Sequence, residues 1–391
     1  MIEKLTRMED LDGIPKVSLS SPSEFYANLR KEGKNLVSWE GELFFEFHNG
    51  TYTSQAGCKK SNRESECQLR NAEMLSVFDS LLAGLTEKGV YNYNKEMFDY
   101  CWKKVMLYQF HDVLPGASMD LIYEETRKGY KEVQQKLSED IITSFQNIIN
   151  NLVKIDPDGQ QNAIAMFNPL PFQREELFGV AINTIKFFSK VKIPPFGFLI
   201  APITQLYMNQ VQTPEIDIAV TDGLITLENS LICVKIEESS GKIISFLDKD
   251  FEELGEPKEI ISSTNELSGG NILCLHKDVP KYWDAWDLWI SYTESKQELL
   301  PSRYTISNNK LNESSVTFYY EGFPFLNTSR MEIEIVMYPD SKRVDFKTNI
   351  TWKEDHKILR VYFPLNIKAP FVTCDIQCGN IKRPTNSNTS W

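Results

Sequence analysis

The sequence is poor in histidine and has no excess of positive charge. Only four of its 391 residues are histidines, at positions 48, 111, 276 and 356, so an imidazole-based site has few members to draw on. Lysine and arginine number 42 against 54 acidic residues, which gives a net charge of −12. Because no basic block or basic-aromatic stripe interrupts this balance, we expect no nucleic-acid partner.

Long hydrophobic runs and paired cysteines are also missing. No apolar run reaches the roughly 18 residues that suggest a membrane-spanning helix, and the N-terminus lacks the apolar stretch of a signal peptide. The seven cysteines are scattered, and no second Cys or His pair accompanies Cys374 and Cys378 to build a zinc or redox motif. We therefore predict reduced thiols, no membrane partner and a cytoplasmic protein.

Several catalytic signatures are absent as well. The chain contains no Walker A loop, no G-x-G-x-x-G after a strand, no H-E-x-x-H and no G-x-S-x-G. Nucleotide-binding, zinc-protease and α/β-hydrolase functions therefore lose their main support.

What is present indicates an α+β multidomain chain. Residues 1–58 have the pattern of the end of an α/β domain. A helix is predicted over SPSEFYANLRKEG, beginning at Ser21 or Ser23 and closed by Gly33. A strand and an Asn49-Gly50 turn are predicted in GELFFEFHNGTYTS.

Residues 59–157 carry three helical stripes, which predict a three-helix bundle. Gly89 is the expected C-cap of the first helix. The stripes are Leu75, Phe78, Leu82 and Leu85; Met97, Cys101, Val105 and Tyr108; and Tyr130, Val133, Leu137, Ile141, Phe145, Ile148 and Leu152.

Residues 158–391 alternate with the period of strands, which predicts an antiparallel β-sandwich. The ending RPTNSNTSW has no polar tail, so we expect this sandwich to be incomplete. The clearest alternating faces are Val344, Phe346, Thr348, Ile350 and Trp352, and then Leu359, Val361 and Phe363.

The stretch YQFHDVLPGAS places His111 and Asp112 before Pro115-Gly116, where a helix should end. A broken helix end can turn two adjacent side chains toward one point, and imidazole with a carboxylate suits Zn²⁺ or Co²⁺. From the residues alone, a His-Asp pair that only caps its own helix is the simpler interpretation, because a ligand set needs three or four members.

Two other stretches could contact a sugar. In EFHNGTYTS, His48 and Tyr52 offer a ring and a hydroxyl, although a turn with a half-buried aromatic residue explains them as well.

In YWDAWD, Trp283 and Trp286 offer flat apolar faces, while Asp284 and Asp287 offer acceptors for hydroxyls. A packing loop between domains is the alternative for this stretch. Two carboxylates about 5–10 Å apart could also perform glycoside hydrolysis.

These stretches resemble glycoside hydrolase family 38, the α-mannosidases. YQFHDVLPGASMDLIYEE resembles the family's central helical segment, and GELFFEFHNGTYTSQAGCKKSNRESE resembles the stretch before it. FNPLPFQREE, YWDAWD and GNIKRPTNSNTSW resemble the β region of the cytosolic branch. The resemblance is collinear over essentially the whole chain.

The resemblance implies a retaining, metal-dependent hydrolysis of terminal α-D-mannose from free oligosaccharides. It implies that His111 is a Zn or Co ligand, that Asp112 contacts the sugar, and that His48 and Tyr52 lie near the sugar pocket. His48 stands where other branches often carry Trp, which weakens that assignment. The 282–287 stretch is the further candidate for substrate binding.

The family's opening H-x-D-x-x-W motif and its nucleophile stretch do not occur in this chain. We therefore expect a fragment that begins inside the catalytic domain, lacks the nucleophile and the acid/base, and is inactive alone. A carbohydrate-binding module without catalysis and a truncated gene product without its own role are the alternatives. The metal, the linkage preference and homo-oligomer formation stay open.

Overall fold

The computed structural model describes residues 2–39, 48–85, 93–152, 163–182, 185–208, 216–253, 256–261, 269–309, 313–322, 328–339, 341–376 and 379–386. The chain divides into two compact units, residues 46–368 and residues 1–45 with 369–391. The second of these units holds helices α1 (Ile2–Met8) and α2 (Pro22–Glu32) and the hairpin of β17 (Phe371–Ile376) and β18 (Gly379–Pro384). Helices and antiparallel sheets together confirm the predicted α+β class.

The N-terminal residues confirm one local prediction and correct another. Helix α2 follows the N-cap Ser21, whose side chain accepts the Glu24 N–H at 3.2 Å, and Gly33 is its C-cap. The predicted turn at Asn49-Gly50 is wrong, because these residues open the short 3₁₀ helix η1 (Asn49–Tyr52). The strand predicted just before it and the cap at Gly89 fall outside the described residues.

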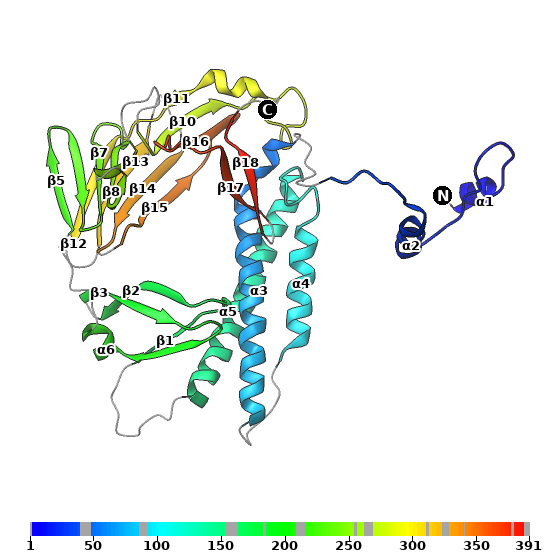
Figure 1. The fold of residues 1–391 in the computed structure, drawn as a ribbon, viewed down its shortest axis with the longest axis horizontal. Coiled ribbons are helices and arrows are strands. Elements are labelled where there is room, and N and C mark those ends of the chain that lie inside the picture. The colour runs from blue at the N-terminus through cyan, green and yellow to red at the C-terminus, as the bar shows by residue number, and fades with distance from the viewer. Residues whose placement is uncertain are drawn as a thin grey trace. The chain divides into compact units, whose positions relative to one another are not determined.

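Three helices, α3 (Ala56–Leu85), α4 (Lys95–Tyr108) and α5 (Asp120–Leu152), pack side by side as the predicted bundle (Figure 1). The predicted apolar stripes are buried in the middle of the helices but not at their ends, where Leu85 is 83% and Leu152 is 49% exposed. The core members of the bundle include Leu69, Ala72, Phe98, Cys101, Val105, Tyr108, Tyr130, Val133 and Leu137.

Polar side chains also occupy the inner face of the bundle. Tyr130 donates its hydroxyl to Asn62 Oδ1 at 3.1 Å, and Gln109 Nε2 lies 3.2 Å from the same oxygen. Further along, Ser76 Oγ donates to Asp140 Oδ2 at 2.8 Å. Burial raises the pKa of Asp140. Because hydrogen bonds demand particular partners, this bundle is specified by polar pairing as well as by apolar burial.

Antiparallel sheets follow the bundle (Figure 1). The smaller ones pair β1 (Ala163–Phe167) with β4 (Phe198–Pro202), beside α6 (Ile203–Met208), and β2 (Arg174–Ile182) with β3 (Ile185–Ile193). A five-stranded sheet contains β5 (Asp217–Thr221), β6 (Leu224–Glu228), β7 (Ile232–Glu237), β8 (Ile243–Glu253) and β9 (Glu256–Ile261).

Two more sheets complete the sandwich. One contains β12 (Arg303–Asn309), β13 (Glu313–Glu321), β14 (Arg330–Met337) and β15 (Val344–Thr351); the other has the order β11 (Gln297–Glu298), β10 (Ile272–Lys277) and β16 (Lys357–Tyr362), with the 3₁₀ helix η2 (Ile290–Ser295) before β11. Residues from all three larger sheets form one apolar cluster that includes Ile225, Val234, Leu273, Phe318 and Ile335. This shared core agrees with the predicted sandwich.

One predicted apolar face is only partly buried. Val344 and Phe346 pack against the core, whereas Ile350 and Val361 are each 47% exposed. Phe346, Ile350 and Val361 line an apolar groove of about 220 Å³, together with Asn271, Leu273, Met331, Ile333, Thr348, Leu359 and Phe363. Within the described sheets, β15 and β16 are edge strands.

The six described cysteines are free thiols, and Cys378 lies outside the described residues. Among the described helices, none combines the length and the apolarity needed to cross a bilayer. The predicted domain boundaries after residues 58 and 157 stay predictions.

Candidate functional site

Two stretches that are far apart in the sequence meet in the structure. Gly50 donates its N–H to Trp286 O at 2.9 Å. His48 Nδ1 lies 3.1 Å from Asp287 Oδ1, and its ring stands edge-on to Trp286 with centroids 5.0 Å apart. Four of the residues that come together here, His48, Trp286, Asp287 and Gly50, belong to the EFHNGTYTS and YWDAWD stretches.

The contact between these stretches requires a close backbone approach. A Cβ on Gly50 would lie 3.1 Å from the carbonyl carbon and oxygen of Trp286, so only glycine fits without displacement. On either side of this contact, His48 and Trp283 adopt left-handed backbone angles, with φ of 67° and 61°. Such angles are unfavourable for residues other than glycine and tend to occur at functional sites.

The third predicted stretch forms a closed turn after α4. The helix ends at Tyr108, so the prediction that Leu-Pro-Gly ends it is wrong by several residues. The reason is that Val113 and Leu114 both donate their N–H groups to Phe110 O, which tightens the chain before proline is reached. His111 therefore lies in the turn.

The side chains of His111 and Asp112 approach each other at the surface. Nε2 lies 3.5 Å from Oδ2, and the side chains are 72% and 45% exposed. The Asp112 backbone is fixed from behind, since its carbonyl accepts from Ser118 Oγ at 2.9 Å and from Tyr123 Oη at 3.3 Å. A rigid backbone thus presents two accessible polar side chains.

The turn containing His111 packs against the segment containing His48. Gly116 has a φ of 108°, and a Cβ there would lie 2.5 Å from Ser54 Cβ. Ser54 also donates its hydroxyl to Gly50 O at 3.0 Å and lies 3.1 Å from Ala285 O. Ser54, at the end of the EFHNGTYTS stretch, therefore contacts both of the other stretches, a role that its sequence context did not indicate.

The remaining predicted residues are exposed. Tyr52 and Trp283 are 63% and 69% exposed, and Asp284 lies on the same loop as Trp283. They can reach a ligand, although they lack the close contacts that hold His48 and Asp287.

Few metal-donor side chains accompany the predicted ligand His111 in the described part of the chain. Among the described residues, no group of three or more His, Cys, Asp or Glu side chains is placed to hold a metal ion. His111 and Asp112 supply two donors, and zinc usually takes three or four protein ligands. The described residues therefore do not make a complete zinc or cobalt site.

Sequence reasoning missed Asp278, which lies just before the YWDAWD loop. Its Oδ1 is buried and has no hydrogen-bond partner among the described residues. Burial raises the pKa of this carboxyl; His356 opposes the rise and Asp284 adds to it. A carboxyl with a raised pKa beside a candidate sugar-binding loop can retain its proton closer to neutral pH.

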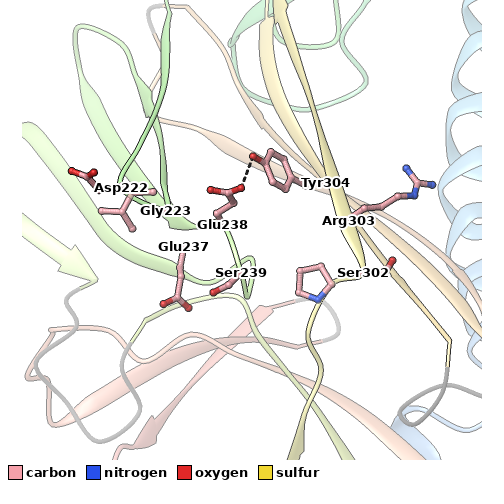
Figure 2. Close-up of a pocket in the computed structure, with 10 residues that line it drawn as sticks. Asp222, Gly223, Glu237, Glu238, Ser239, Ser302, Arg303 and Tyr304 are labelled. Atoms are coloured by element: carbon pink, nitrogen blue, oxygen red, sulfur yellow. Dashed lines mark hydrogen bonds between the residues drawn. The ribbon is translucent and has the colours of Figure 1, made fainter.

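A separate cleft of about 500 Å³ lies in the β region and contains none of the predicted residues. It is lined by turns at Asp222 and Glu238 and by the start of β12. Figure 2 shows Tyr304 donating to Glu238 Oε1, at 2.9 Å. Carboxylates beside an aromatic ring give this cleft the groups that sugar hydroxyls need.

Known proteins match the chain along its whole length. It is 31% identical over 395 residues to Alpha-mannosidase 2C1 of Homo sapiens, covering 100% of this chain and 36% of that relative. It is 32% identical over 434 residues to Alpha-mannosidase G of Dictyostelium discoideum, covering 100% of this chain and 38% of that relative. The chain thus spans little more than a third of the length of these curated relatives.

A solved structure shares the fold. An alpha-mannosidase from Enterococcus faecalis superposes with a TM-score of 0.63 at 14% identity, covering 95% of this chain and 50% of that chain. Two family descriptions match the sequence, "Alpha mannosidase middle domain" over residues 46–148 and "Glycosyl hydrolases family 38 C-terminal domain" over residues 227–391. The chain therefore belongs to glycoside hydrolase family 38.

Proposed function

We propose that this chain is the middle and C-terminal part of an α-mannosidase that removes terminal α-D-mannose from free oligosaccharides with retention of configuration. The observation that carries the proposal is the meeting of the 48–54, 110–116 and 283–287 segments around Ser54. The family relatives named as α-mannosidases support the reaction class.

The described side chains would bind and orient the sugar. Asp287, whose Oδ1 contacts the His48 imidazole, would accept hydrogen bonds from sugar hydroxyls. Trp286 offers an apolar face for the C–H side of the sugar ring. Asp112 is accessible for a further hydroxyl. Tyr52, Trp283 and Asp284 would line the outer part of this proposed site.

We propose His111 as a Zn or Co ligand of the complete enzyme, with its other ligands, the nucleophile and the acid/base outside this chain. The isolated chain should then not hydrolyse α-mannosides. A chromogenic α-mannoside assay with added Co²⁺ or Zn²⁺ tests this, and turnover that disappears in His111→Ala would contradict it.

The assignment of His111 is tested in a chimera. The matching segment of Alpha-mannosidase G is replaced by residues 1–391, and the metal content and turnover are measured. His111→Ala should lower metal affinity at least about 10-fold. Lys60→Met, on an exposed face of α3, is the control. Unchanged metal content in a folded His111→Ala chimera would reject the ligand role.

A second candidate, a carbohydrate-binding module without catalysis, is favoured by the cleft in Figure 2. Calorimetric titration with an α-linked mannobiose separates the two candidates. Asp287→Asn should abolish binding if the 48–287 site is used, whereas Glu238→Gln should abolish it if the cleft is used. Retained binding in Asp287→Asn would count against the first candidate.

A further inference from the structure

Lys59 in the first turn of α3 makes an unusual set of contacts. Its Nζ lies 2.5 Å from Ser54 O. The same nitrogen lies 2.7 Å from Leu114 O and 3.3 Å from Pro115 O. In the described part of the chain it has no carboxylate within ion-pair distance, so the ammonium directs its donors to main-chain oxygens alone.

The geometry suits an ammonium group in particular. A lysine carries three N–H donors and no acceptor, which matches three converging carbonyls. Burial lowers the pKa of Lys59, as expected for a cation removed from water without a counter-charge. An apolar side chain of equal length would leave these partly buried carbonyls without their donor, at a cost comparable to several lost hydrogen bonds.

The acceptors belong to two of the segments that form the candidate site. Ser54 is the residue whose hydroxyl also contacts Ala285 O, so its position is shared with the YWDAWD loop. Leu114 closes the turn that contains His111, because its N–H donates to Phe110 O. Fixing Leu114 O thus fixes the turn on which His111 is carried.

We propose that Lys59 is a positioning residue, which holds the His111-Asp112 turn against the His48 segment and thereby sets how the two halves of the site face each other. The role deepens the proposed function and rests on it for its meaning, although the contact itself exists whether or not the chain acts on mannose. Lys59 touches no reacting group and acts only through the two backbones that it joins.

The test uses the four histidines as reporters. The 391-residue chain is labelled with ¹³C-histidine, and imidazole spectra are recorded at one fixed pH after assignment by single His→Gln variants. In Lys59→Met the signals of His111 and His48 should move by more than a linewidth, while those of His276 and His356 should not. Lys59→Arg should bring both signals back toward the wild-type positions.

Lys60→Met is the matched control, because Lys60 is the next residue, is exposed and, among the described residues, forms its ion pair with Glu64 on its own helix. The proposal is overturned if His111 does not move in folded Lys59→Met, or if Lys60→Met moves it equally. Should Lys59→Met fail to fold, Lys59→Gln, which keeps two N–H donors, is judged by the same criterion. If neither variant folds, Lys59 serves folding and the positioning role is rejected.

The result is independent of sugar chemistry. Movement of His111 in the chain, together with unchanged metal content in the His111→Ala chimera, would retain the positioning role and reject the proposed ligand role of His111. Mannoside binding that needs Asp287, with no movement of His111, would reject the positioning role and retain the proposed function.

Discussion

Two fully buried tyrosines, one in the helical bundle and one in the β-sandwich, differ in what their hydroxyls contact, although the bundle also holds Tyr108, whose buried hydroxyl has no hydrogen-bond partner among the described residues. Tyr130 in the bundle is 1% exposed and donates to Asn62. Tyr320 in the sandwich is also 1% exposed, yet its hydroxyl has no hydrogen-bond partner among the described residues. Burial raises the pKa of both phenols.

The contrast extends to the surroundings. Tyr130 belongs to a polar network with Asn62 and Gln109, whereas the neighbours of Tyr320 in the sandwich cluster are aliphatic, aromatic or methionine side chains. Helices can slide or rotate against one another, so specific hydrogen bonds help to choose one arrangement. Sheets already have their register fixed by backbone pairing. Apolar filling is then enough to hold the strands together.

The largest expected effect tests the apolar filling. Phe318→Ala should lower the free energy of unfolding by about 3–5 kcal/mol, since Phe318 is fully buried and the apolar neighbours cannot close the cavity. Urea unfolding followed by circular dichroism measures it. The exposed Phe172→Ala is the control and should change stability by less than about 0.5 kcal/mol. A loss below that limit in Phe318→Ala would mean that the sandwich core is loosely packed.

A smaller effect compares the two tyrosines directly. Tyr130→Phe should cost about 0.5–1.5 kcal/mol, because it removes a donor from Asn62 Oδ1. Tyr320→Phe should be neutral or slightly stabilising, because it removes a buried hydroxyl that has no partner. Both are measured by urea unfolding. Equal costs for the two changes would contradict the distinction between Tyr130 and Tyr320.

The smallest expected effect is a dependence of the free energy of unfolding on pH, which arises from His276 in the sandwich. Burial lowers the pKa of His276 below its ordinary value of 6.5, and its Nε2 lies 3.0 Å from the Tyr362 hydroxyl. Below pH 6.5 the His276 imidazole is protonated in the unfolded chain but stays neutral in the folded chain until its lower pKa is reached. The free energy of unfolding therefore decreases as the pH falls. The slope should be at most about 1.4 kcal/mol per pH unit.

Unfolding curves between pH 7.5 and 5 test this contribution, with His276→Gln as the comparison. The variant should show a shallower loss than the wild type, because its side chain does not titrate. His111→Asn, which replaces a histidine whose side chain is 72% exposed, is the control for the general effect of removing an imidazole. Identical slopes in wild type and His276→Gln would show that His276 does not contribute.

Elements that depend on local pattern could be predicted from the sequence. Periodic apolar residues revealed all three bundle helices, and the caps Ser21 and Gly33 located α2. The start of α3 at Ala56 was missed because its inward positions there include the polar Asn62 and Ser65. The exposed ends of the stripes were missed because periodicity does not say where a neighbouring element stops.

The sequence indicated which residues belong to the candidate site, but it did not indicate which of them come into contact. Composition selected His48, Asp287 and His111, yet nothing local says that Gly50 would bond the backbone of Trp286. The sequence did not indicate the role of Lys59, because a lysine near the start of a helix normally extends into water. Only the three-dimensional path of the chain shows which carbonyls converge on it.

The apolar groove beside β15 and β16 affects how the folding of this protein can be monitored. Hydrophobic dyes such as ANS fluoresce on exposed apolar surface and are widely used to detect partly folded states. A chain that carries a 220 Å³ apolar groove in its folded form offers such dyes a binding place without any loss of packing. Dye fluorescence should therefore be read against near-ultraviolet circular dichroism, which reports whether the aromatic side chains remain fixed.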